Sequence, residues 1–129
     1  MAATRTEALP APWQPVCRLD DLADGRARGF ATDPRGDDGA FVVKRDGGLY
    51  AYRNLCPHNL RPLEYAKDRF LSADGSDIIC YAHGAHFNIV DGVCSYGPCL
   101  GERLMTLPVR VHADWIWVAL SPVPDQASQ

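Results

Sequence analysis

Cysteine and histidine occur close together twice in this chain, as "CPH" at residues 56–58 and as "CYAH" at residues 80–83. Each pair stands where a run of strand-forming residues gives way to a turn. Loops at the ends of two neighbouring hairpins can converge on one point while the strands behind them hold the loops rigid. The pattern therefore predicts a metal site on an antiparallel β framework.

The rest of the sequence is typical of a small β protein. Residues 40–55, "AFVVKRDGGLYAYRNL", predict a hairpin, because glycine tolerates the positive φ of a tight reversal. Residues 77–98 predict a strand into the "CYAH" turn, a strand out over residues 87–90, and a third strand after "DG". Residues 107–120, "LPVRVHADWIWVAL", alternate with the period of half-buried strands and reverse at "HAD". We expect an all-β fold, a small antiparallel sandwich or barrel with both metal-binding loops at one end, with at most a short helical turn within residues 59–70.

At 129 residues the chain is about one domain long. Prolines mark residues 1–13 as a loose lead-in and residues 122–129 as a tail, which leaves one domain over residues 14–121. A net charge of -3 disfavours nucleic acid as a partner. We find neither a signal peptide nor a membrane span, so we expect a cytoplasmic protein.

The five cysteines are an odd number, and in a reducing compartment such thiols are more often metal ligands or bystanders than a disulfide framework. Two thiolates and two imidazoles could bind zinc, or they could hold an iron–sulfur cluster. Zinc fingers usually pair cysteine with cysteine and histidine with histidine, whereas each loop here supplies one of each. The iron–sulfur interpretation therefore fits better.

The motifs "CPH", "CYAHGAHF" and the later "GP" resemble those of the Rieske [2Fe-2S] proteins, and most closely those of stand-alone bacterial Rieske-type ferredoxins. The resemblance implies that Cys56 and Cys80 bind the inner iron of one cluster, and that His58 and His83 bind the outer iron. It also implies that a third loop with Gly97 and Pro98 shields the cluster.

What the resemblance implies about function is electron transfer. The chain would carry single electrons from a flavin-type reductase to a terminal oxygenase or a similar enzyme, with both partners docking at the tip formed by His58 and His83. Such a chain has no catalytic site of its own. Neutral imidazoles in place of two thiolates remove negative charge from the site and raise its reduction potential.

Departures from the respiratory members of the family concern the residues around the cluster. Arg61, Ala82, Ala85 and Phe87 stand where those members have a disulfide and hydroxyl donors. With fewer hydrogen bonds to the cluster sulfurs, we expect a potential in the lower part of the roughly -150 to +300 mV Rieske range.

The remaining cysteines and histidines have simpler interpretations. His86 is expected on the outgoing strand in a structural role, and His112 in a solvated turn. Cys94 and Cys99 could form a disulfide, serve as extra ligands or pack as reduced thiols, and reduced thiols are favoured. Cys17 is expected to be buried and inert in the first strand.

Two other functions compete with the free carrier. The same fold could be a small subunit or regulatory module of a larger oxidoreductase, as in nitrite reductases. Alternatively, the four residues could hold zinc in a purely structural domain.

Overall fold

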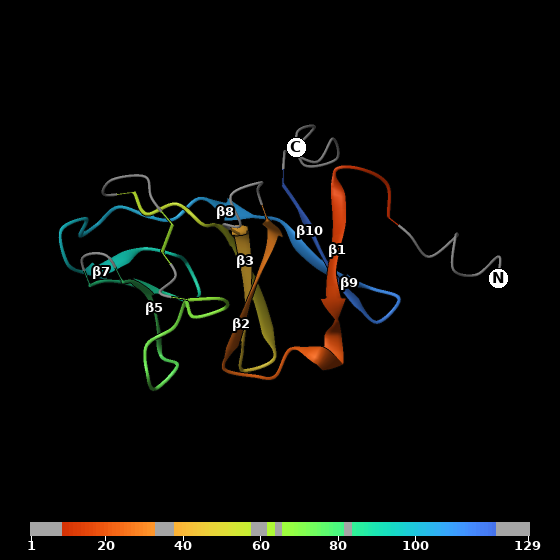
Figure 1. Ribbon diagram of the computed structural model, residues 1–129, viewed down its shortest axis with the longest axis horizontal. Helices are drawn as coiled ribbons and strands as arrows, with labels where there is room; N and C mark the ends of the chain where they lie inside the picture. The colour runs from red at the N-terminus through yellow and green to blue at the C-terminus, as the bar shows by residue number, and fades with distance from the viewer. Residues whose placement is uncertain (1–8, 33–37, 58–61, 64–65, 82–83, 121–129) are drawn as a thin grey trace.

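The computed structural model describes residues 9–32, 38–57, 62–63, 66–81 and 84–120. Within these ranges ten strands form three antiparallel sheets, and the one helical element is a short 3-10 turn, η1 (Leu19–Asp21). The sheets follow one another along the long axis of the molecule (Figure 1). The all-β antiparallel fold is thereby confirmed. Most of the predicted lead-in and all of the predicted tail lie outside the described residues.

The middle sheet has the order β2 (Arg26–Thr32), β3 (Asp38–Arg45), β4 (Gly48–Arg53) and β8 (Thr106–Leu107). Strands β3 and β4 form the predicted hairpin. Asp46 and Gly47 occupy its turn with φ of 52° and 81°. Positive φ at both central residues matches the twist of the flanking strands, which is why the "DGG" stretch reverses the chain here.

The sheet at one end of the molecule has the order β1 (Trp13–Arg18), β10 (Trp115–Ala119) and β9 (Val109–His112). The predicted reversal at "HAD" joins β9 to β10 through Ala113 and Asp114, both with positive φ. Cys17 lies buried in β1, as predicted. His112 ends β9 half-buried, and its backbone carbonyl accepts a hydrogen bond from Trp117 Nε1 at 3.1 Å.

The sheet at the opposite end has the order β5 (Asp77–Cys80), β6 (Ala85–Asn88) and β7 (Cys94–Tyr96). Strand β6 was predicted at residues 87–90 but begins at Ala85, which pairs directly with Cys80. It ends at Asn88 because the Asn88 side chain accepts the Val90 amide, and Asp91 then accepts that of Val93. These side-chain hydrogen bonds close a turn in place of the ladder.

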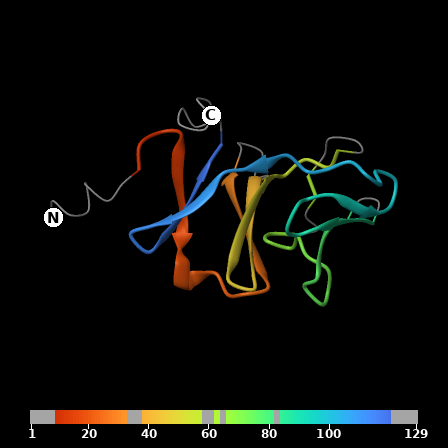
Figure 2. The ribbon, with the colours of Figure 1, turned by 180° about the vertical axis from the view of Figure 1, so that it is seen from behind.

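Alternation along β3 places neighbouring side chains in two different cores, one on each face of the middle sheet. Phe41 and Val43 face the core shared with β5, β6 and β7, whereas Ala40 and Val42 face the core shared with β1 and β10. All four side chains are fully buried. The middle sheet therefore separates the two end sheets, as the reverse view also shows (Figure 2).

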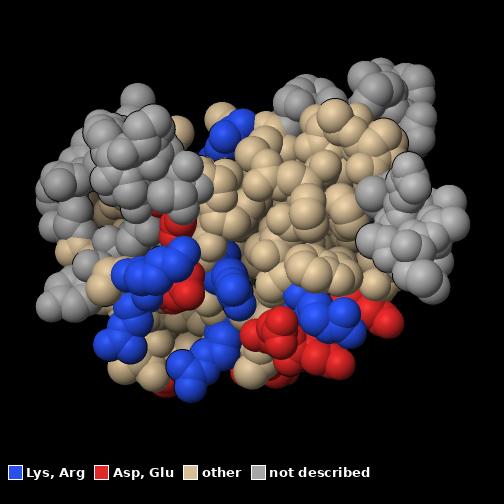
Figure 3. All heavy atoms as spheres, turned by 45° about the vertical axis from the view of Figure 1, so that its right-hand side comes forward, with Lys and Arg blue, Asp and Glu red and all other residues tan. Residues whose placement is uncertain are grey.

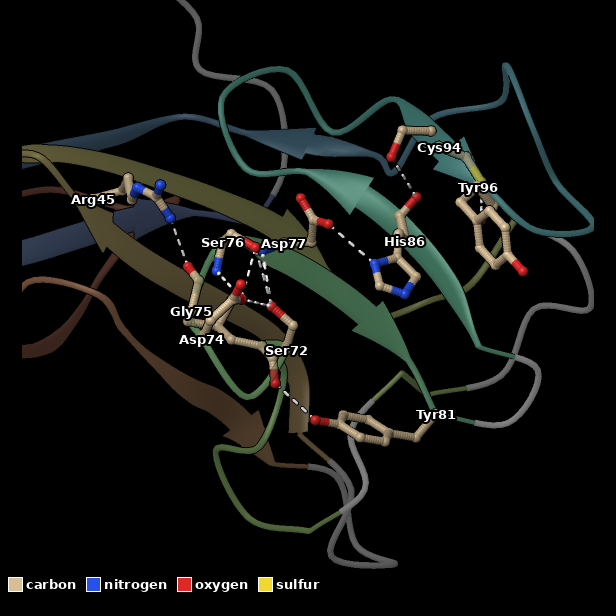
Figure 4. Close-up of polar contacts among 12 residues, drawn as sticks. Arg45, Ser72, Asp74, Gly75, Ser76, Asp77, Tyr81, His86, Cys94 and Tyr96 are labelled. Carbon is tan, nitrogen blue, oxygen red and sulfur yellow. Dashed lines mark hydrogen bonds and ion pairs between the residues drawn. The ribbon is translucent and has the colours of Figure 1, made fainter.

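Residues 66–76, before β5, form a loop that is anchored on the middle sheet, called the 66–76 loop below. Its tip is a turn at Asp74 and Gly75, with Gly75 at a φ of 75°, and Leu71 bridges to Ile78. Arg45 Nη1 donates to the Gly75 carbonyl at 2.6 Å (Figure 4). Within the predicted helical turn of residues 59–70, residues 66–70 form a hydrogen-bonded turn rather than a helix, with Arg69 N–H donating to the Ala66 carbonyl.

The surface carries charges of both signs. In one view Lys, Arg, Asp and Glu side chains gather along one edge, while much of the remaining described surface on that face is uncharged (Figure 3). No helix among the described residues is long and apolar enough to cross a membrane.

Candidate metal centre

Cys56 and Cys80 lie at the ends of two strands that belong to different sheets. Cys56 follows the end of β4, and Cys80 is the last residue of β5. Both side chains are fully buried in the core that also contains Leu63, Phe70 and Phe87. No disulfide joins any of the five cysteines, all of which lie in the described ranges. The fold thus supplies two buried thiols on loops that share one core.

Asn54, two residues before Cys56, fixes the first loop. Its backbone N–H donates to the Gly39 carbonyl at 3.0 Å, and its Nδ2 donates to the Asp38 carbonyl at 2.8 Å. Its Oδ1 accepts the Leu63 N–H at 2.7 Å. The Asn54 side chain is buried, so each of these bonds forms where water cannot replace it.

Leu63 continues this chain of hydrogen bonds to the second loop. Its carbonyl accepts the N–H of Tyr81, the residue after Cys80, at 3.1 Å. The Gly84 N–H donates to the Cys80 carbonyl at 2.8 Å and closes the turn, with Gly84 at a φ of 72°. The two cysteine loops are therefore joined through backbone groups of Leu63.

Tyr81 also links the second cysteine loop to the 66–76 loop. Its hydroxyl donates to the Leu71 carbonyl at 2.7 Å (Figure 4). Lys67 and Asp68 attach the 66–76 loop to the middle sheet. Lys67 Nζ lies 2.8 Å from the buried Asp38 Oδ2, and Asp68 accepts the Gly29 N–H at 2.7 Å. Burial lowers the pKa of Lys67, but the hydrogen bond to Asp38 and the charge of Asp68 outweigh it and raise that pKa overall.

His58 and His83 lie outside the described residues, as do Arg61 and Ala82. Their assignment as ligands or as cluster neighbours stays a prediction. Ala85 and Phe87, which stand where the respiratory members have hydroxyl donors, are fully buried on β6.

The third loop packs against the start of β6. A Cβ atom at Gly97 would lie 2.8 Å from the Cα of Ala85, so this approach leaves no space for a side chain. Cys94 and Cys99 flank Gly97 and are both buried, with their sulfurs 3.2 Å apart. Burial and the hydrogen bond to Cys94 raise the pKa of Cys99 to about 12, and the nearby Cys56 sulfur acts in the same direction.

His86 has the structural partner that its place on the outgoing strand predicts. Its Nδ1 lies 3.0 Å from Asp77 Oδ2 on β5, and its ring meets the Tyr96 ring edge-on at 5.5 Å between centroids (Figure 4). The three residues link β5, β6 and β7 across the sheet beside the cysteine loops.

The donor set fits the thiolate half of a Rieske centre. Two buried cysteines are presented by two hydrogen-bonded loops, and a third loop packs beside them. Across the described ranges no group of three or more His, Cys, Asp or Glu side chains forms a metal site, and the two predicted imidazoles lie outside those ranges. The sequence patterns did not reveal Asn54, Leu63 and Tyr81 as the connection between the loops, because those bonds depend on tertiary structure.

Comparison with known proteins identifies the class to which this fold and this pair of loops belong. Residues 12–113 match the Rieske [2Fe-2S] domain, and the chain therefore belongs to this family. The cofactor of the family is a [2Fe-2S] cluster with two cysteine and two histidine ligands.

Individual relatives narrow the class to ferredoxins. The chain is 31% identical over 111 residues to the ferredoxin component of the alkene monooxygenase system of Xanthobacter autotrophicus, covering 86% of this chain and 84% of that protein. The solved ferredoxin of carbazole 1,9a-dioxygenase from Nocardioides aromaticivorans superposes with a TM-score of 0.64 at 28% identity, covering 84% of this chain and 98% of that one. The chain is also 31% identical to a nitrite reductase of Emericella nidulans over 88% of its own length, but it spans only 11% of that enzyme.

Proposed function

We propose that this chain is a Rieske-type ferredoxin that carries single electrons from a reductase to an oxygenase, with Cys56, His58, Cys80 and His83 as the ligands of its cluster. The observation that carries the proposal is the hydrogen-bonded connection of the Cys56 and Cys80 loops through Leu63, on a chain that covers 84% and 98% of two oxygenase-system ferredoxins. When bound, the cluster accepts and releases one electron at a time.

The described residues account for how the site would be held. Burial of Cys56 and Cys80 keeps water from the sulfurs, and the Asn54 hydrogen bonds fix the loop that carries Cys56. A rigid ligand set changes little when the charge of the site changes, and this lowers the reorganisation that electron transfer requires. Gly97 allows the third loop to approach β6 closely, and in this proposal that loop shields the cluster from water.

Exposed apolar side chains beside these loops support docking at this end of the molecule. Leu55 and Tyr81, next to the two cysteines, are each 41% exposed, and Leu100 in the third loop is 69% exposed. In this proposal a reductase and an oxygenase use this end in turn, the chain catalyses no bond chemistry itself, and it works in the cytoplasm.

Two measurements test the proposal. Iron and acid-labile sulfide should be present in equal amounts, and a redox titration should give a midpoint in the lower part of the roughly -150 to +300 mV Rieske range. A clearly positive midpoint would contradict placement among the ferredoxins. Zinc without sulfide would instead make the domain structural.

The similarity to a segment of nitrite reductase favours a second function, that of a small subunit within a larger oxidoreductase. Affinity purification at physiological expression distinguishes the two. A free carrier elutes from a sizing column as an isolated small protein, whereas a subunit remains bound to one large enzyme through the column.

A further inference from the structure

Cys94 and Cys99 form a thiol pair that the proposed electron transfer does not use. The Cys99 thiol donates to the Cys94 sulfur with the two sulfurs 3.2 Å apart, and each side chain is 1% exposed. Cys94 also donates toward the Tyr96 carbonyl at 3.3 Å (Figure 4).

The backbone holds the two thiols opposite one another. The Cys94 N–H donates to the Glu102 carbonyl at 2.7 Å, and the Gly101 N–H donates to the Cys94 carbonyl at 3.1 Å. The Glu102 N–H donates to the Cys99 carbonyl at 2.8 Å. These bonds close the base of the turn at residues 97–101. The backbone therefore places the two cysteines opposite one another, and the contact between their sulfurs does not depend on the rotamer of either side chain alone.

A disulfide needs a sulfur–sulfur distance of about 2.0 Å, so the two sulfurs, now 3.2 Å apart, must approach by roughly 1.2 Å. We propose that Cys94 and Cys99 are a reversible dithiol–disulfide site whose closure ties the turn at residues 97–101 to β7. The oxidant is a low-molecular-weight disulfide. One cysteine sulfur attacks it and releases a thiol, and the second cysteine then attacks the mixed disulfide and releases the other thiol. Two cysteine thiols lose two electrons and two protons, and the oxidant is reduced to two thiols.

The surroundings of the pair make the reaction selective. Cys17 lies in the other core, on β1, and cannot reach either sulfur. Cys56 and Cys80 are reserved as cluster ligands if the proposed function holds. Pro98 and Leu100 on the turn are exposed, so local opening of this short surface segment admits the oxidant to thiols that are buried in the closed form.

The test uses the whole cluster-containing protein and bis(2-hydroxyethyl) disulfide, a small neutral oxidant. After treatment, free thiols are alkylated in denaturant and the protein is analysed by intact mass and peptide mapping. We expect a loss of two hydrogens in mass, a Cys94–Cys99 cross-linked peptide, alkylation of the other three cysteines, and recovery of all five thiols with dithiothreitol.

The Cys99→Ser variant should instead retain one half of the oxidant as a stable mixed disulfide on Cys94, the other half having left as a thiol, because Cys99 is no longer there to attack that mixed disulfide. Cys17→Ser is the matched control and should form the disulfide as fully as the wild type does. Five alkylatable thiols in the treated wild type, a stable adduct there, or a first cross-link that involves Cys56 or Cys80 would overturn the proposal. The EPR signal of the cluster, recorded on the same samples, reports separately on the proposed function.

Discussion

The Oδ1 atom of Asn54 accepts the backbone N–H of Leu63 at 2.7 Å, and both residues are buried. Through the Leu63 carbonyl this hydrogen bond continues to the residue after Cys80. The geometry of the two cysteine loops therefore depends on a side chain that is itself not a ligand.

Replacing Asn54 by alanine should lower the free energy of unfolding by about 1–3 kcal/mol, because it leaves the Leu63 N–H and the Asp38 carbonyl without this partner in the protein interior. Urea unfolding followed by circular dichroism measures the loss, and the visible absorbance of the cluster should disappear at lower urea than in the wild type. Asn88→Ala is the matched control, because Asn88 is the exposed last residue of β6 and its side chain accepts one amide. Equal losses in the two variants would contradict the role given to Asn54.

Replacing Gly97 by alanine should destabilise the protein more than replacing Gly101 by alanine. Both glycines have positive φ, 111° and 89°, so both variants strain the backbone. Only at Gly97 would the new Cβ meet another atom, 2.8 Å away at Ala85 Cα, whereas nothing lies within 4 Å of a Cβ at Gly101.

The difference between these two glycine variants should be about 1–3 kcal/mol of unfolding free energy, the usual cost of overpacking. The rate of cluster loss on dilution into chelator should rise in the Gly97 variant and stay near that of the wild type in the Gly101 variant. Equal unfolding free energies and equal rates of cluster loss in the two variants would show that the close contact of Gly97 with β6 contributes neither to stability nor to retention of the cluster.

The titration of Tyr52 should change the free energy of unfolding at alkaline pH. Its hydroxyl donates to the Ile89 carbonyl at 2.6 Å, and burial raises the pKa of this tyrosine from 10 to about 12. A raised pKa favours the neutral form in the folded state, so its stabilising contribution is fully present below pH 10 and is lost as the pH rises through 12.

Tyr52→Phe removes this titration together with the hydrogen bond. Below pH 10 the variant should be less stable by about 1 kcal/mol, and this deficit should shrink as the pH rises above 10. Urea unfolding at a series of pH values measures the difference between the two proteins. A deficit that stays constant up to pH 12 would contradict the shift.

Local patterns predicted most of the fold because the strands and turns are encoded locally. The "DGG" and "HAD" reversals lie where φ becomes positive, and alternation along β3 separates the two cores. The start of β6 was placed two residues too late, because the register is fixed by pairing of Ala85 with Cys80, and a propensity pattern does not contain that contact.

At the candidate site, the motif identified the cysteines but not what holds them. The hydrogen bonds of Asn54 and Tyr81 join segments distant in the sequence, and no local spacing indicates them. For Cys94 and Cys99 the spacing left three alternatives open and favoured packed reduced thiols, and the structure has both thiols free and buried. The contact between their sulfurs depends on the backbone bonds that close their turn, which the spacing does not indicate.

The proposed function depends on a [2Fe-2S] cluster held by Cys56, Cys80, His58 and His83. EPR of the dithionite-reduced protein detects this ligand set, because nitrogen ligation of one iron gives Rieske centres a lower average g value than all-cysteine clusters. We predict the low-average signal in the wild type, its loss or alteration in His58→Ala and His83→Ala, and its persistence in Cys94→Ser and Cys99→Ser. A signal of the all-cysteine type, or one that survives loss of the histidines and disappears with Cys94, would contradict the account.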